Sequence, residues 1–392
     1  MTSSTSLLLA QLQSVAAEFV EIRRSIHAHP ELAFEETRTS DMVAESLARW
    51  GYAVHRGLGV TGVVGVLKKG SGGKSLGIRA DMDALPIHER TGLDYASRLP
   101  GKMHACGHDG HTAILLCAAK YVAEKLDFNG RLNLIFQPAE ENEGGAMRMV
   151  DEGLFELFPC DEIYALHNAP GLPVGRMAIS QGPAMASFDR VTVTLRGRSA
   201  HGAMPHHGID SMQCAASIVL GLQSIITREI DAQQAAVITV GSIQAGEVFN
   251  IVPESAVLKI GVRALHPDVR SWVEKRIKAF VQAQAESYQL SCDIDYVHKY
   301  PVLVNCAAQT EYARQVAIRL LGEDKVGERT PTMGSEDFAY MLQKRPGAYI
   351  RLGNGVGEDG GCMVNNPLYD FNDKALPIGA AFWTHLVQSY LA

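Results

Sequence analysis

The sequence predicts an α/β protein in which a sheet covered by helices is interrupted by an inserted α+β domain. Its 392 residues exceed the size at which one hydrophobic core usually keeps growing, which favours two domains. Short apolar runs alternate with helical stretches in the first half of the chain, whereas polar and apolar residues alternate strictly soon after Ser187. The change in periodicity marks the expected domain boundary.

The first domain is expected to begin with a helix and to continue as strands and helices in turn. Apolar residues recur at helical spacing within residues 7–24, and the pattern ends before Pro30. The next elements are expected at residues 62–67 and 76–78 as strands, 112–126 as a helix and 131–136 as a strand.

The second domain is expected to have a β-α-β-β-α-β order, as in ferredoxin-like folds. Its strands and helices are expected at residues 190–196, 211–228, 236–243, 256–263, 269–288 and 291–297. We therefore expect an insertion at residues 187–298, between two parts of the first domain at residues 1–186 and 299–392.

Charge and hydropathy exclude several classes of partner. The formal charge is −7 and there is no dense Lys/Arg run, so nucleic acid is not expected as a partner. No stretch approaches the roughly 20 apolar residues of a membrane span, and the apolar residues 7–10 lack the basic flank of a signal peptide. Seven cysteines at irregular spacing favour free thiols, and with them a cytoplasmic location.

Residues 103–112 gather one thiol and three imidazoles directly before an expected helix. Thiolate and imidazole are good ligands for divalent transition metals, and Cys106 and His108 are close enough in sequence to turn toward one ion. The alternative is a polar loop whose histidines cap the helix. The density of ligand-type side chains favours the metal site.

A second segment, residues 136–145, places Glu140 and Glu141 after a hydrophobic strand. Reactive groups of α/β enzymes are exposed at strand ends, and adjacent carboxylates can divide their roles. If Glu141 coordinates a metal, Glu140 can take a proton from a metal-activated water. The alternative is a solvated acidic turn.

Three further candidates follow strand-like runs. Asp81 and Asp83 come after residues 76–78 and could orient ligating histidines, although a helix cap or turn would also account for them. His167 follows the apolar residues 163–166 and is expected at the end of a strand. A lone histidine there is more often structural, so only the other motifs favour a functional role for His167.

The second domain contributes a Gly/Pro-rich loop at residues 199–208 that contains His201. Such a loop can approach a substrate closely. Asn250 and Arg263 add an amide and a fixed cation, which suit an oxyanion or a carboxylate. Each of these residues taken alone is also compatible with a structural role.

Read in order, the motifs resemble the dinuclear metallopeptidase family of aminoacylases and glutamate carboxypeptidases. The resemblance runs from His-Ala-His-Pro-Glu-Leu at 27–32 to Asn-Pro-Leu-Tyr-Asp-Phe-Asn-Asp at 366–373. Cys-Gly-His-Asp-Gly-His at 106–111 and Arg-Ala-Asp-Met-Asp-Ala-Leu-Pro at 79–86 are similar to hippurate hydrolases, bacterial N-acyl amino acid amidohydrolases and plant auxin-conjugate hydrolases.

The resemblance implies a dinuclear-metal catalytic domain with a central mixed sheet flanked by helices, and a ferredoxin-like lid that mediates dimerisation. It implies that Glu140 is the general base and that two divalent ions, Mn²⁺, Zn²⁺, Co²⁺ or Ni²⁺, are bound by Cys106, His108, Glu141 and His167. In the lid, His201 would stabilise the oxyanion and Asn250 would assist substrate binding. Gly334 and Glu336 match a segment that lines the cleft.

One position departs from the family pattern. The family places a metal-ligating His before Asn-Pro near the C-terminus, whereas this chain has Asn365 there, and its sequence has no His between His298 and His385. Asn365 is therefore a doubtful ligand, and the second metal site is expected to be weakened.

The implied reaction is hydrolysis of the amide bond of a small N-acyl amino acid by a homodimer or higher homo-oligomer. Two other functions remain open from the residues. One is a dipeptidase or aminopeptidase on the same metal centre, and the other is a binding protein that has lost turnover because of Asn365.

Overall fold

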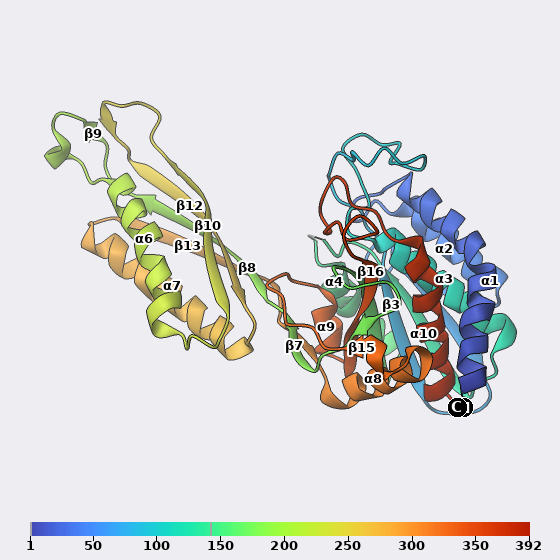
Figure 1. Cartoon of the computed structure of the whole chain (residues 1–392). Helices are drawn as coiled ribbons and strands as arrows, with labels where there is room; N and C mark the ends of the chain where they lie inside the picture. Colours follow the sequence, from blue (N-terminus) through green and yellow to red (C-terminus); the bar gives the residue numbers. More distant parts are fainter. Residues whose placement is uncertain (1, 142) are drawn as a thin grey trace. The chain divides into compact units, whose positions relative to one another are not determined.

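The computed structural model describes residues 2–141 and 143–392, which form two compact units (Figure 1). Unit 1 extends to Gly182 and also contains Val304–Thr330 and Asp337–Ala392. Unit 2 consists of Pro183–Leu303 and Pro331–Glu336. The chain passes between the units in β7 (Gly182–Met185) and β14 (Leu303–Asn305), and again on either side of Pro331–Glu336.

Unit 1 is built on a mixed sheet with the strand order β1-β2-β4-β3-β5-β16-β6-β15. The central strands β4, β3, β5 and β16 are parallel, whereas β1 and β2 are antiparallel additions at one side. The strands span Ala53–Arg56 (β1), Val63–Lys69 (β2), Ser75–Asp81 (β3), Gly130–Gln137 (β4), Glu162–Pro170 (β5), Met177–Ala178 (β6), Val326–Gly327 (β15) and Gly347–Gly355 (β16).

Helices cover both faces of this sheet, so its central strands are buried. Every residue of β3 is buried, which is typical of a parallel strand packed between helices. The helices span Thr2–His27 (α1), Thr37–Arg49 (α2), His108–Lys125 (α3), Gly145–Asp151 (α4), Leu154–Leu157 (α5), Ala307–Leu321 (α8), Phe338–Leu342 (α9) and Leu376–Tyr390 (α10). Short 3₁₀ turns lie at Glu323–Lys325 and Asp373–Ala375.

The first and last helices of the chain pack against α3. Figure 1 shows α1, α3 and α10 side by side, and residues of all three belong to one hydrophobic core with β3 and β4. Leu12 and Phe19 of α1 and Trp383 of α10 are almost completely buried there. This packing fixes α3, whose N-terminus reaches the carboxyl edge of the parallel strands.

Unit 2 is an antiparallel sheet with the order β10-β12-β8-β13 and two helices, the ferredoxin-like arrangement that the sequence predicts. Buried residues alternate along β12, and they form one core with apolar residues of α6 and α7. The elements span Phe188–Arg196 (β8), Ala200–His201 (β9), Ser211–Glu229 (α6), Ala236–Ala245 (β10), Ile251–Val252 (β11), Ser255–Ala264 (β12), Pro267–Ser287 (α7) and Ser291–Tyr300 (β13), with a 3₁₀ turn at Pro205–His207.

The predicted fold class, a mixed sheet flanked by helices plus a ferredoxin-like domain, is confirmed. Among residues 2–141 and 143–392, we find no helix long and apolar enough to span a membrane.

The packing of α1 against α3 gives a test of this fold. Leu12 is 0% exposed, whereas Leu7 on the same helix is 57% exposed. Leu12→Ala should lower the free energy of unfolding of unit 1 by about 2–5 kcal/mol, because it leaves a cavity in the core. Leu7→Ala is the matched control and should change the free energy of unfolding by less than about 0.5 kcal/mol. Urea titration followed by circular dichroism measures both, and equal shifts would contradict this packing.

Candidate metal centre

The N-terminus of α3 carries imidazoles toward the edge of the sheet. The helix begins at His108, so His108 and His111 lie in its first turn, and the predicted start near Thr112 is wrong. Gly107 precedes the helix in a left-handed conformation with φ 95°. A Cβ on Gly107 would lie 2.4 Å from Asn168 Oδ1, so only glycine fits where the chain enters the helix.

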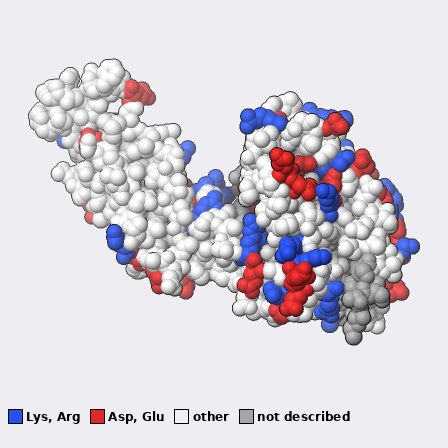
Figure 2. Space-filling model, viewed as in Figure 1, with Lys and Arg blue, Asp and Glu red and all other residues white. Residues whose placement is uncertain are grey.

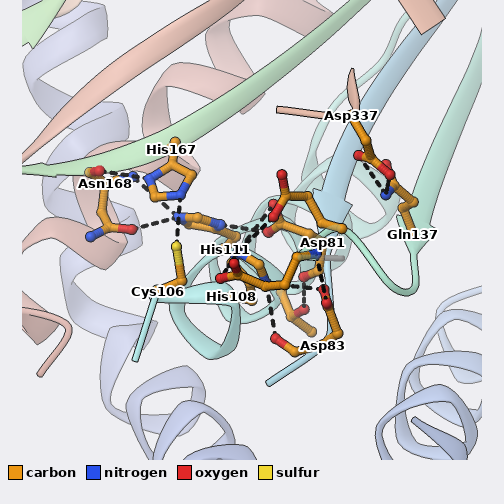
Figure 3. Close-up of polar contacts among 12 residues, drawn as sticks. Asp81, Asp83, Cys106, His108, His111, Gln137, His167, Asn168 and Asp337 are labelled. Carbon is orange, nitrogen blue, oxygen red and sulfur yellow. Dashed lines mark hydrogen bonds and ion pairs between the residues drawn. The ribbon is translucent and has the colours of Figure 1, made fainter. Parts of the chain in front are cut away.

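Cys106 and His108, at the start of α3, converge with His167 of β5, as Figure 3 shows. Cys106 Sγ lies 3.4 Å from His167 Nε2, and one potential ligand atom from each residue falls within 4.8 Å of the others. All three side chains are buried. A thiol and two imidazoles at this spacing form a donor set suited to a divalent transition metal.

Two carboxylates lie beside this donor set. Glu140 and Glu141 follow the carboxyl end of β4, where the ends of the parallel strands meet. His108 Nε2 is 4.0 Å from Glu140 Oε2 and 3.9 Å from Glu141 Oε1. The structure therefore brings both predicted carboxylates to the same imidazole nitrogen.

Asp83 fixes the ring of His108. His108 Nδ1 lies 2.9 Å from the Asp83 carbonyl oxygen and 3.1 Å from Asp83 Oδ1, both of which are hydrogen-bond acceptors. If Nδ1 carries the proton, Nε2 keeps its lone pair for a metal. Asp81, the last residue of β3, lies 2.6 Å from His111 Nδ1 and orients that ring in the same way.

His167 is oriented by the backbone of its own strand. His167 Nδ1 lies 2.7 Å from the carbonyl oxygen of Asn168, which leaves Nε2 facing Cys106. The residue lies inside β5, which continues to Pro170, so its predicted place at a strand end is wrong. Pairing with β16 in register, with Arg351 opposite His167, extends the strand through residues of low strand propensity.

The electrostatics of the site follow from burial and close carboxylates. Burial lowers the pKa of His108, but Asp81 and Asp83 outweigh it and raise that pKa to about 10. Burial raises the pKa of Glu141 above its usual range, His108 opposes the effect, and Asp83 adds to it. Burial and Glu141 also raise the pKa of the Cys106 thiol well above its usual range. Binding a cation at Cys106 must therefore release a proton.

Burial, together with His111, holds the pKa of His167 well below its usual range. His167 is therefore a neutral imidazole, the form in which histidine binds a metal.

Orphaned polar atoms show that these residues fit a metal. Within residues 2–141 and 143–392, His108 Nε2 and Glu141 Oε1 are buried without a hydrogen-bond partner. His108 Nε2 lies 3.6 Å from Asp81 Oδ2, which is longer than a hydrogen bond. Buried polar atoms are costly unless they are paired or coordinate a cation. The donor set matches what a divalent ion needs.

The backbone of Asn365 is hydrogen-bonded next to this cluster. Its amide nitrogen is 2.7 Å from the carbonyl oxygen of Ala105, the residue before Cys106. The residue is exposed and has φ 61°, a left-handed conformation that asparagine adopts more readily than most residues. Tyr369, four residues later, accepts a hydrogen bond of 2.7 Å from Asn168 Nδ2.

The remaining predicted residues belong to unit 2 and fall into two groups. His201 of β9 pairs with Ile251 of β11, and the Asn250 carbonyl oxygen accepts the amide of Gly202 at 2.7 Å. His201 and Asn250 are thus close neighbours, and both are exposed. Their predicted roles stay predictions.

The second group surrounds the segment 331–336. Arg263 donates a hydrogen bond of 2.8 Å to the Met333 carbonyl oxygen. Its guanidinium carbon lies 4.6 Å from the centroid of the Phe188 ring. The carbonyl of Gly334 accepts the amide of Ala186 at 2.8 Å, and Glu336 is buried. Arg263 therefore holds its own chain in this structure, and its predicted contact with substrate stays a prediction.

Several residues near the cluster have contacts that the sequence motifs did not predict. His111 contacts Asp81 and lies 2.8 Å from Asn168 Oδ1. A buried network of Arg79, Gln137 and Asp337 lies beside the end of β4. The alternation of charged and apolar residues at 79–83 was a signal for Arg79, but its partner Asp337 is 258 residues away in sequence.

Thiol, imidazole and carboxylate donors buried at the carboxyl edge of an α/β sheet suit a metal-dependent hydrolase. Residues 77–389 match the model of peptidase family M20/M25/M40, and the chain belongs to this family.

Named relatives match nearly the whole chain. Hippurate hydrolase of Campylobacter jejuni is 40% identical over 98% of this chain and 99% of its own length. N-acetyl-L-cysteine deacetylase of Bacillus subtilis is 35% identical over 93% of this chain and 86% of its own length. The crystal structure of the YXEP protein of Bacillus subtilis, a dinuclear metal-binding peptidase of the M20 family, aligns with a TM-score of 0.84 at 29% identity, covering 97% of this chain and 99% of that one.

The thiol in the donor set gives a direct test. Cys106→Ala should lower metal affinity by at least about 100-fold, because a buried thiolate ligand is lost. Cys117→Ala, in α3 and 1% exposed, is the matched control and should leave metal affinity unchanged. Competition with a chromogenic chelator measures both. Undiminished affinity in the Cys106 variant would make Cys106 a structural residue.

The departure at Asn365 gives a second test. Histidine also tolerates the left-handed conformation, so Asn365→His should fold normally. It should raise occupancy of a second metal and increase amide hydrolysis, because imidazole is a better donor than an amide oxygen to first-row transition metals. Metal titration and steady-state kinetics compare the two forms. Equal stoichiometry, affinity and turnover would place residue 365 outside the metal centre.

Proposed function

We propose that the chain is a metal-dependent amidohydrolase that cleaves the amide bond of N-acyl amino acids such as hippurate. The observation that carries this proposal is the buried set of Cys106, His108 and His167, with Glu140 and Glu141 at its side. Relatives named hippurate hydrolase and N-acetyl-L-cysteine deacetylase, at 40% and 35% identity, support the substrate class.

The proposed cofactor is a pair of divalent ions, Mn²⁺, Zn²⁺, Co²⁺ or Ni²⁺. Cys106, His108, Glu141 and His167 are the proposed ligands, and Asn365 is a weak fifth candidate. When bound, such ions polarise the amide carbonyl and make water more acidic. Asp83 and Asp81 serve as orienting groups for the imidazoles of His108 and His111.

Glu140 is the proposed general base. Its carboxylate lies beside His108 Nε2 and does not need to bind an ion if Glu141 does. An ionised carboxylate there can take a proton from the attacking water and then deliver it to the nitrogen of the leaving amine. With this proton the substrate nitrogen leaves as a neutral amine when the C–N bond breaks.

Unit 2 is proposed to complete the site. His201 is assigned the stabilisation of negative charge on the substrate oxygen, and Asn250 a hydrogen bond to substrate. Arg263, Gly334 and Glu336 are assigned to substrate binding. In this proposal residues 1–186 and 299–392 form the metal-binding catalytic domain, and residues 187–298 form the lid.

Unit 2 is also the proposed contact between copies of the chain. Figure 2 shows that much of the visible face of unit 2 carries no charged side chain. Exposed apolar residues include Leu220 of α6, Ile243 of β10 and Phe249. Strand β10 lies at the end of the sheet order, and apolar sheet edges are prone to pair with another chain. A homodimer or higher homo-oligomer would cover this surface.

Asn365 favours one other function, a binding protein that keeps the cleft without turnover. A peptidase acting on dipeptides uses the same donor set and is the second alternative. An assay of the protein reconstituted with each metal should compare hippurate, N-acetyl amino acids and dipeptides. The proposal predicts hydrolysis of hippurate or N-acetyl amino acids. Faster cleavage of dipeptides indicates the peptidase, and binding without hydrolysis indicates the impaired protein.

The proposed base gives a test of the mechanism. Glu140→Gln should leave folding and metal content nearly unchanged and should reduce turnover by at least about 100-fold, the scale of lost general-base catalysis. Stopped assays under metal saturation measure turnover, and elemental analysis measures the metal. Near-normal turnover would reject Glu140 as the base.

A further inference from the structure

A buried carboxylate outside the metal centre holds the chain just before Glu140. Glu36, at the start of α2, is 0% exposed. Its Oε2 accepts a hydrogen bond of 2.6 Å from the Thr61 hydroxyl, and its Oε1 accepts one of 2.9 Å from the amide of Ala139. A carboxylate is rarely buried so completely without a specific task for its oxygens.

Ala139 has an unfavourable backbone conformation that the surrounding structure must stabilise. It has φ 56°, in the left-handed region that a residue with a Cβ rarely occupies, and it is 0% exposed. Such a conformation persists only when the surrounding structure imposes it. The peptide that follows Ala139 leads directly to Glu140, so the backbone angles at residue 139 decide the direction of the Glu140 side chain.

Glu141 has an anchor of its own. Its amide donates a hydrogen bond of 3.0 Å to Asp83 Oδ2, and the Ala139 carbonyl accepts the amide of Gly145 at 3.0 Å. Loss of the contact between Glu36 and Ala139 would therefore disturb Glu140 more than Glu141.

We propose that Glu36 is a positioning residue for Glu140: by accepting the Ala139 amide it keeps this left-handed turn in place and aims the general base at the reacting water. The role rests on the proposed function of Glu140. Glu36 does not touch substrate or metal in this scheme.

The protonation of Glu36 is consistent with this role. Burial raises its pKa to about 7, and the hydrogen bond from Thr61 partly opposes the effect. Either form of the carboxyl group keeps an oxygen that can accept the Ala139 amide. Glutamine keeps such an oxygen as well, and methionine fills a similar volume without one. The pair Glu36→Gln and Glu36→Met thus separates hydrogen bonding from packing.

The experiment compares these two variants with Glu31→Met. Glu31 lies in the segment before α2, and its carboxylate accepts hydrogen bonds from the amides of Arg38 at 2.8 Å and Thr39 at 2.9 Å in the first turn of that helix. Glu36→Met should lower kcat by about 100-fold, the scale of a misplaced catalytic group, with KM and metal content within about threefold of wild type. Glu36→Gln should restore kcat to within about threefold, and Glu31→Met should leave kcat unchanged.

Hydrogen exchange of the Ala139 amide, measured on the metal-free protein, gives a readout that does not depend on activity. The amide should be as protected as those of β4 in the wild type and in Glu36→Gln, and should exchange at least about tenfold faster in Glu36→Met. An unprotected Ala139 amide in the wild type overturns the proposal even if Glu36→Met fails to fold.

Equal kcat losses in Glu36→Met and Glu31→Met also overturn it, because they would reflect a shared loss of stability. If the wild type hydrolyses no amide, the proposed function fails, and the exchange data still decide whether Glu36 holds Ala139.

Discussion

The burial of polar atoms that lack a hydrogen-bond partner is the constraint on which the metal centre depends. His108 Nε2 and Glu141 Oε1 are buried side by side at 3.9 Å, and the described part of the chain offers neither a hydrogen bond. Removing such atoms from water is unfavourable, and a bound cation reverses the sign of that contribution. The fold supports this arrangement because the parallel strands β3, β4 and β5 end at one edge, where α3 begins.

The rest of unit 1 keeps the donors fixed. Asp83 and the Asn168 carbonyl hold the rings of His108 and His167 through the nitrogen that faces away from the cluster. Arg23, fully buried in α1, forms ion pairs through Nη1 with Asp109 Oδ2 at 3.4 Å and Asp370 Oδ1 at 2.9 Å. It thereby links the start of α3 to the C-terminal segment. These contacts orient the donor side chains through groups of the chain itself, which lowers the cost of ordering the site.

Much of this structure could be predicted where the signal is local. The strict alternation at residues 190–196 identifies an antiparallel strand with one buried face. The density of thiol and imidazole at 103–112 points to Cys106 and His108, two of the side chains that the structure brings together as a candidate metal site. The contacts of His111 with Asp81 and of Glu36 with Ala139 could not be predicted from the sequence, because they depend on the order of the strands.

The start of α3 and the length of β5 were missed for related reasons. Gly107 in a left-handed conformation is not a common helix start signal, and Asn168 and Pro170 belong to β5 only because neighbouring strands pair with it.

The central claim is that Cys106, His108, Glu141 and His167 bind two divalent ions. Anomalous diffraction from crystals grown with Mn²⁺ or Zn²⁺, collected on both sides of the metal absorption edge, tests it most directly. The account predicts two anomalous peaks. One of them should lie within about 2.4 Å of His108 Nε2 and of either Cys106 Sγ or the neighbouring donor atoms of Glu141 and His167. Peaks only at surface carboxylates, with none within bonding distance of His108 Nε2, would contradict it.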